Sequence, residues 1–310
     1  MRLLLKIFKG FLYIILLVAL FSTAAAFWPI KTVPVAQLAG KDDSFVKVSG
    51  LTIHYRKTGQ GPPLVLVHGF AGSTFTWQRL IPLLTDRFTV YCLDLPGFGL
   101  SDKPKYFDYD MHNQGRTVLG FMDALRLKTA ALAGHSMGGV VAACAALEAP
   151  GRVERLALIE PGFYFSGTPA FLSHLFFPLD RLMARVFYSK KFFSTFLQGS
   201  YYDMSLVTNE VIDAYLVPAA TPGSVDALTS MYKYADRKYE GLTAAITCPT
   251  LIVWGENSHK ANVAEKLQLA DRIKHEIRDS KLVLVPACGH YVQEEKPAEL
   301  ARAMIGFLAR

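Results

Sequence analysis

The stretch that most constrains how this chain can fold is Leu132–Gly139, with the sequence LAGHSMGG. An apolar run enters it and a run of small residues, 140–147, leaves it, which predicts a strand, a sharp turn and a helix. Ser136 lies at the centre of a G-x-S-x-G pattern, the layout of a turn that holds a serine hydroxyl clear of the backbone. We expect glycine at Gly134 and Gly138 because a side chain at either position would collide with neighbouring backbone. The turn also places Ser136 at a helix N-terminus, where backbone N–H groups face a developing negative charge.

Short apolar runs alternate with helical patterns on both sides of this turn. The runs that predict buried strands are 64–67, 88–93, 153–159, 250–254 and 282–285. Such alternation is typical of parallel β-α-β units. The rhythm breaks after Glu160, where an aromatic-rich and helical pattern without buried strands continues to Leu242. We therefore predict an α/β core with a mostly parallel sheet flanked by helices, formed by 44–160 and 243–310, with a helical cap at 161–242 and a linker at 29–43.

Composition excludes two classes of protein. The chain has 310 residues, of which 51% are hydrophobic and 19% charged, and this suits a well-buried core rather than disorder. The net charge of +7 is not concentrated in a dense basic block, so we expect no nucleic-acid partner. The four cysteines are Cys92, Cys144, Cys248 and Cys288. They lack metal-ligand spacing and are expected to be buried free thiols, and we expect no metal site.

The N-terminal segment, 1–28, contains an almost uninterrupted apolar stretch that follows Arg2, Lys6 and Lys9. We favour an uncleaved single-pass membrane anchor with the catalytic domain exported. The alternative is a signal segment cleaved near Ala24–Ala26, which would leave a secreted or periplasmic protein.

Five sequence pieces in order, each placed at a predicted strand end, resemble the α/β-hydrolase fold family over about 46–310. They are His68-Gly69-Phe70, Asp94–Gly99, Gly134–Gly139, Trp254-Gly255-Glu256 and Gly289-His290. The chain is most similar to the capped branch that contains epoxide hydrolases, haloalkane dehalogenases, carbon–carbon bond hydrolases and many esterases. Epoxide hydrolases and dehalogenases carry aspartate at the turn, whereas this chain carries Ser136. The resemblance therefore implies acyl transfer through an acyl-enzyme, with a cap inserted after the strand ending at Glu160 and no cofactor.

The resemblance also implies roles for individual residues. Ser136 is the expected nucleophile, and His290, which follows the last predicted strand, is the expected base that accepts and returns its proton. The backbone N–H groups of Phe70 and Met137 are expected to form the oxyanion hole. His135, beside the nucleophile, is interpreted as a packing residue.

The acid that orients the histidine departs from the family pattern. The family usually carries W-G-x-x-D after the predicted strand at 250–254, but Ser258 stands where the aspartate is expected. Our first choice is Glu160, at the end of the neighbouring predicted strand, as in some dehalogenases of the family. Glu256 is the second, if its loop is shifted, and a triad without a charged acid is the third.

The leading interpretation is a serine hydrolase of carboxylic esters with an apolar acyl or alcohol part. Carbon–carbon cleavage of a ring-fission product, which uses the same triad, and a catalytically weak membrane-associated binding protein are the alternatives. The aromatic-rich cap predicts a medium-to-large apolar substrate, which would be a small molecule rather than a macromolecule. Its aromatic residues could form the cap's own core or lie on a membrane surface, and both interpretations stay open here, as does the oligomeric state.

Overall fold

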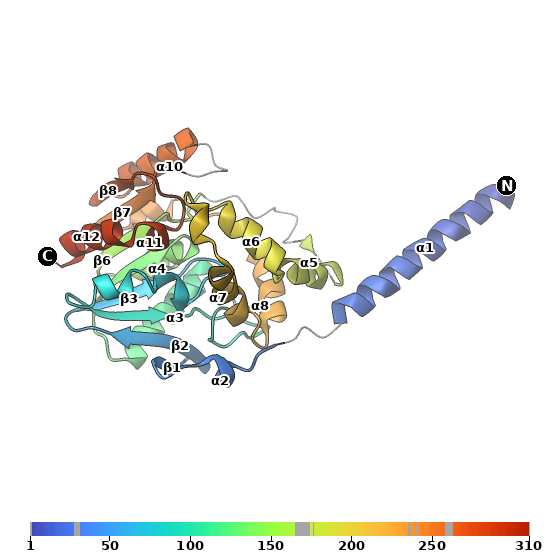
Figure 1. Ribbon diagram of the computed structural model, residues 1–310, viewed down its shortest axis with the longest axis horizontal. Coiled ribbons are helices and arrows are strands. Elements are labelled where there is room, and N and C mark those ends of the chain that lie inside the picture. The colour runs from blue at the N-terminus through green and yellow to red at the C-terminus, as the bar shows by residue number, and fades with distance from the viewer. Residues whose placement is uncertain are drawn as a thin grey trace.

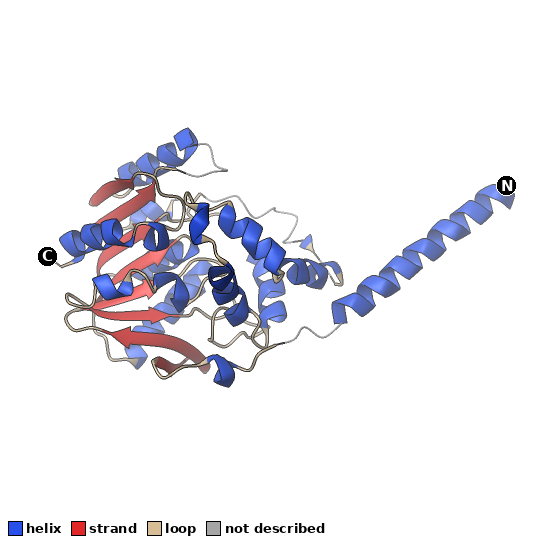
Figure 2. Ribbon diagram, viewed as in Figure 1, coloured by secondary structure: helices blue, strands red, loops and turns tan. Residues whose placement is uncertain are grey.

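The computed structural model describes residues 2–27, 32–164, 174, 175, 177–234, 237–239, 241–257 and 263–309. Its centre is an eight-stranded sheet in the order β1-β2-β4-β3-β5-β6-β7-β8 (Figures 1 and 2). The strands are β1 (Asp43–Val48), β2 (Leu51–Thr58), β3 (Pro63–Val67), β4 (Thr89–Leu93), β5 (Ala130–His135), β6 (Val153–Ile159), β7 (Thr250–Gly255) and β8 (Ser280–Val285). Strand β2 is antiparallel to its neighbours β1 and β4, and every other pairing is parallel. The predicted mostly parallel sheet is confirmed.

Helices cover both faces of the sheet. The first face packs against α3 (Met111–Ala124), α4 (Met137–Glu148) and α10 (Val263–Glu276), and the second packs mainly against α12 (Pro297–Leu308). Side chains along β5 alternate between the two faces, with Leu132 in the first apolar cluster and Ala133 in the second. Burial on both faces explains why the central strands are continuous apolar runs in the sequence.

The chain between β6 and β7 is helical where the structure describes it, which confirms a cap inserted after the strand that ends before Glu160. Its helices are α5 (Leu179–Phe187), α6 (Lys190–Gln198), α7 (Asn209–Ala219), α8 (Ser224–Met231) and α9 (Leu242–Ala245). Phe193, Leu197 and Tyr215 are buried together and pack against Ala71 and Tyr291 of the core. Many aromatic residues of the cap therefore form its own interior and its contact with the α/β core. The boundaries 161 and 242 stay predictions.

Helix α1 (Arg2–Phe27) extends away from the rest of the molecule (Figure 1). Within the described residues, no helix has both the length and the apolar character that a bilayer crossing requires. The prediction of a single-pass anchor at 1–28 is therefore wrong. The membrane attachment and membrane localisation that we derived from it are corrected with it.

The predicted turn at Ser136 joins β5 to α4 and depends on its glycines. Ser136 itself has φ 53° and ψ −118°, a conformation that non-glycine residues rarely adopt. A Cβ atom at Gly134 would lie 2.2 Å from the carbonyl oxygen of Gly138. A Cβ atom at Gly138 would lie 2.2 Å from the carbonyl oxygen of Val67. The backbone of the turn therefore contacts the end of β3 directly, as the glycine pattern predicted.

We expect Gly138→Ala to destabilise the fold by more than about 4 kcal/mol, or to prevent folding, because the new methyl group would overlap backbone atoms that cannot move independently. Gly306→Ala on α12 is the matched control, because a Cβ atom there meets nothing within 4 Å. It should stabilise the helix by about 0.5–1 kcal/mol. Urea unfolding of both variants provides the measurement. A Gly138→Ala protein with wild-type stability would contradict the close backbone contact.

Candidate functional site

The backbone around Ser136 is held by the segment that follows β6. The Ser136 N–H donates to the carbonyl of Ile159 at 2.9 Å, and the Ser136 carbonyl accepts from Gly162 N–H at 3.1 Å and from Gly139 N–H at 3.0 Å. The Ser136 side chain remains half-buried rather than enclosed. Hydrogen bonds on both sides of the residue therefore hold its positive φ in place.

The structure brings together Glu160 and His290, although they are far apart in the sequence. Glu160 Oε2 lies 3.1 Å from His290 Nδ1. The Gly255 N–H donates to the other carboxylate oxygen, Oε1, at 2.8 Å, and Lys266 Nζ lies 3.1 Å from the same oxygen. The Glu160 side chain is only 2% exposed, whereas that of His290 is 31% exposed. A buried carboxylate thus faces one nitrogen of a partly accessible imidazole.

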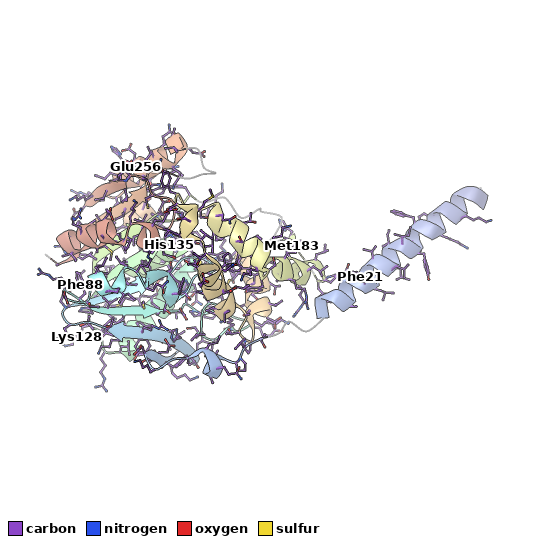
Figure 3. All side chains as sticks on the ribbon, viewed as in Figure 1. Phe21, Phe88, Lys128, His135, Met183 and Glu256 are labelled. Carbon is purple, nitrogen blue, oxygen red and sulfur yellow. The ribbon has the colours of Figure 1, made fainter. Side chains whose placement is uncertain are left out.

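The sequence named two other positions in connection with the acid: Glu256, the second choice, and Ser258, where the family carries aspartate. Glu256 follows β7 and its backbone N–H continues the pairing with β8 by donating to the carbonyl of Val285 at 3.0 Å. No hydrogen bond or ion pair connects the described side chains of Glu256 and His290, and Figure 3 labels Glu256 in the part of the molecule that carries β7, β8 and α10. Ser258 lies outside the described residues. The geometry therefore favours Glu160 over Glu256 as the partner of His290.

His135 was interpreted from the sequence as a packing residue, but in the structure it also makes a hydrogen bond to His290. Its Nε2–H donates to the carbonyl oxygen of His290 at 2.9 Å, and the two ring centroids are 4.6 Å apart. Burial, together with the nearby His290, lowers the pKa of His135 well below its ordinary value, so the ring is neutral near pH 7. Its position directly before Ser136 was the only signal in the sequence. His135 fixes the backbone that carries the His290 side chain.

Phe70 and Met137, the expected oxyanion donors, belong to two segments that meet at Ser136. Met137 is the first residue of α4, and Phe70 follows Gly69, where a Cβ atom would lie 3.1 Å from Ser136 Cβ. Neither backbone N–H donates a hydrogen bond to any other residue that the structure describes. His68 holds the Phe70 loop, because its Nε2 accepts from Leu95 N–H at 3.0 Å. Among the described residues, these two backbone N–H groups therefore have no backbone acceptor.

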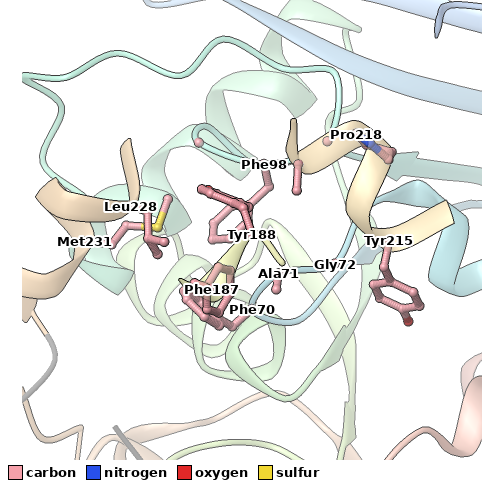
Figure 4. Close-up of a pocket in the computed structure, with 13 residues that line it drawn as sticks. Phe70, Ala71, Gly72, Phe98, Phe187, Tyr188, Tyr215, Pro218, Leu228 and Met231 are labelled. Atoms are coloured by element: carbon pink, nitrogen blue, oxygen red, sulfur yellow. The ribbon is translucent and has the colours of Figure 1, made fainter. Parts of the chain in front are cut away.

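A small apolar pocket lies beside Phe70 (Figure 4). Loops of the core provide Phe70, Ala71 and Phe98, and the cap provides Phe187 and Met231 among other residues. The rings of Phe70 and Phe187 make an edge-to-face contact at 5.5 Å. The pocket is therefore apolar and lies between loops of the core and helices of the cap.

Glu294 connects the cap to the core close to the same histidine. It lies on α11 (Val292–Glu295) and is 3% exposed. Its carboxylate accepts hydrogen bonds from Thr76 Oγ1 of the core at 2.6 Å, from Tyr201 of the cap at 2.8 Å, and from the Tyr215 hydroxyl of the cap. Burial raises the pKa of Glu294 above its usual value, although these hydrogen bonds oppose the shift.

Residues 62–297 match the model of the alpha/beta hydrolase fold family. The chain belongs to this family. It is 30% identical to the uncharacterized hydrolase YugF of Bacillus subtilis, over 82% of this chain and 92% of that protein. It is 28% identical to the 2-hydroxy-6-oxo-2,4-heptadienoate hydrolase of Pseudomonas putida, over 85% of this chain and 95% of that enzyme. A solved structure described as a membrane phospholipase A, a novel bacterial virulence factor, is 29% identical with a TM-score of 0.71, covering 99% of this chain and 96% of that one. These similarities identify the chain as a hydrolase.

The raised pKa of Glu294 makes stability depend on pH in a definite direction. The folded protein holds the proton to higher pH than the unfolded chain does, so this group contributes stability that decreases as pH rises from about 4.5 through the folded pKa. Glu294→Gln removes the titration. We expect the free energy of unfolding of the variant, relative to wild type, to increase between pH 5 and pH 8 in urea titrations. A constant difference over that range would contradict the raised pKa.

Proposed function

We propose that this hydrolase cleaves carboxylic esters with an apolar acyl or alcohol part, through an acyl-enzyme on Ser136. The observation that carries the proposal is the contact of 3.1 Å between Glu160 Oε2 and His290 Nδ1. Glu160 would hold the imidazole in the tautomer that leaves Nε2 unprotonated, and Nε2 would then accept the proton of the serine hydroxyl. Without this carboxylate, His290 would lack the acid that the family pattern expects at Ser258.

The reaction proceeds in two steps. Ser136 Oγ attacks the ester carbonyl while His290 takes its proton, and the N–H groups of Phe70 and Met137 donate to the developing oxyanion. His290 then returns the proton to the leaving alcohol, and the acyl group remains on Ser136. Water, activated by the same imidazole, releases the acid. The carboxylate of Glu160 stabilises the imidazolium that forms in each step.

The apolar pocket and one relative support an ester as the substrate. The pocket beside Phe70 suits an acyl or alkyl chain, because its lining from Phe98, Phe187 and Met231 is apolar. The related solved structure is named a phospholipase A, and phospholipases of that type cleave esters. Carbon–carbon cleavage is the second candidate, because the Pseudomonas putida relative is named a 2-hydroxy-6-oxo-2,4-heptadienoate hydrolase. A panel of p-nitrophenyl esters of varied chain length, run against a ring-fission product, distinguishes the two.

Labelling with a fluorophosphonate probe tests the nucleophile. We expect the wild-type protein to form a stoichiometric adduct at Ser136, because an activated serine attacks phosphorus as it attacks a carbonyl. Ser136→Ala is the control and should show no adduct, as judged by intact-protein mass spectrometry. A folded wild-type protein that resists the probe would instead favour a binding protein without catalysis.

Parallel substitution of the two glutamates tests the acid. Glu160→Gln should lower kcat/KM for a p-nitrophenyl ester by on the order of a thousandfold to ten-thousandfold, because the imidazolium loses its charged partner. Glu256→Gln is the matched control and should stay within about threefold of wild type, as is usual for a residue away from the reacting groups. Near-normal turnover of Glu160→Gln would remove Glu160 from the mechanism.

A further inference from the structure

Glu295, the last residue of α11, joins two segments that are far apart in the sequence, and the proposed mechanism does not use it. Its Oε1 accepts a hydrogen bond from the Gly289 N–H at 2.8 Å. Its Oε2 accepts from the N–H groups of Tyr202 at 2.8 Å and Asp203 at 3.0 Å. Gly289 directly precedes His290, and Tyr202 and Asp203 belong to the cap segment after α6. One carboxylate therefore connects the cap to the loop that carries the expected base.

The same cap segment also contacts the backbone of His290 directly. The His290 N–H donates to the carbonyl oxygen of Ser200 at 2.8 Å. A Cβ atom at Gly289 would lie 2.5 Å from the Ser200 carbonyl oxygen and 2.6 Å from the Tyr202 nitrogen, so the two backbones are in direct contact and only glycine fits between them. Gly289 is buried, so its N–H needs an acceptor inside the protein, and Glu295 provides one.

The opposite side of the His290 backbone is held by the sheet. His135, the last residue of β5, donates from its Nε2–H to the His290 carbonyl oxygen at 2.9 Å. The backbone of His290 therefore lies between a strand end and the cap segment and is hydrogen-bonded to both. The strand end is fixed by its neighbours in the sheet, whereas the cap segment meets this loop through Ser200 and Glu295. A displacement of the cap segment would thus displace the backbone that carries the imidazole.

The neighbouring Glu294 contacts different groups. Its carboxylate accepts from the hydroxyl groups of Thr76, Tyr201 and Tyr215, so it connects side chains of the cap with side chains of the core. Within the described part of the chain, the carboxylate of Glu295 instead accepts from backbone N–H groups. The two adjacent glutamates therefore differ in what they hold: Glu294 holds side chains of the cap, and Glu295 holds the two backbones that meet beside the base.

We propose that Glu295 is a positioning residue for the base: its carboxylate holds the cap segment 200–203 against Gly289, and through that contact it fixes the backbone of His290. The cap thereby contributes to the alignment of the base as well as to the apolar pocket. The kinetic consequence rests on the proposed ester hydrolysis, but the structural claim concerns the resting protein and is measurable without turnover.

Kinetics test the positioning role through two substitutions. Glu295→Ala removes both acceptor oxygens and Glu295→Gln keeps one, so we expect kcat for p-nitrophenyl butyrate to fall by on the order of a hundredfold in the first and by less in the second. KM should stay within about threefold of wild type, because other residues line the apolar pocket and only the alignment of the base changes. Glu299→Gln, which removes an exposed carboxylate from α12, is the matched control and should leave both constants unchanged.

Amide hydrogen exchange of the full chain, followed by NMR, gives the decisive readout. The His290 N–H donates to Ser200 and not to Glu295, so a purely local role of Glu295 would leave its exchange unchanged. We expect this amide to exchange about fivefold to tenfold faster in Glu295→Ala, the factor that one lost hydrogen bond typically contributes. The rate is taken relative to the amides of β5 in the same protein, which corrects for any loss of global stability. Should Glu295→Ala fail to fold, Glu295→Gln replaces it under the same criteria.

Failure of the two proposals is distinguishable. A wild-type protein that neither hydrolyses p-nitrophenyl esters nor reacts with a fluorophosphonate would refute the proposed function, and the exchange of the His290 N–H would still decide whether Glu295 fixes this backbone. In an active protein, unchanged relative exchange of the His290 N–H would overturn the role of Glu295 whatever happens to kcat. A kcat that stays within about threefold of wild type in both Glu295 variants would overturn it as well.

Discussion

The arrangement of the candidate site depends on one buried carboxylate, that of Glu160, and on the parallel strands that bring its partners to it. Strands β5, β6 and β7 are neighbours in the sheet, and Ser136, Glu160 and Glu256 directly follow them. The carboxyl ends of parallel strands meet at one edge of a sheet, so residues distant in the sequence converge there. Because β6 lies between β5 and β7, a glutamate at its end contacts Gly255 on one side and lies beside the serine turn on the other.

The serine turn and the buried strands were predictable from the sequence, because each depends on residues that are close together in the chain. The turn at Ser136 requires Gly134 and Gly138 whatever the rest of the chain does, and the apolar runs specify strands buried on both faces. The choice of Glu160 over Glu256 needed only the order of the strands and the missing aspartate at Ser258. Its contact with His290 agrees with that choice, and its catalytic role stays a prediction until the variants are measured.

The sequence could not reveal contacts that depend on side chains meeting between distant elements. Lys266 lies on a helical pattern with several other charged residues, and nothing in that pattern separates it from a solvated lysine. Glu294 is one of two adjacent glutamates, and only the fold shows that Tyr201 and Tyr215 of the cap surround it. The N-terminal prediction failed for a related reason: it used a count of apolar residues, whereas the described part of α1 does not provide a helix able to cross a bilayer.

Hydrogen bonds connect the cap to the segment that carries His290, the expected base, and they limit how substrate can enter. The His290 N–H donates to the carbonyl of Ser200 at 2.8 Å, and the Tyr202 N–H donates to Glu295 Oε2 at 2.8 Å. His135 holds the carbonyl of His290 from the opposite side. Any movement that separated the segment after α6 from the His290 loop would break these bonds, one of which holds the backbone of His290. Substrate entry that preserves the candidate triad must therefore keep these hydrogen bonds between the cap and the His290 loop, and the apolar pocket is bordered by α5, α7 and α8.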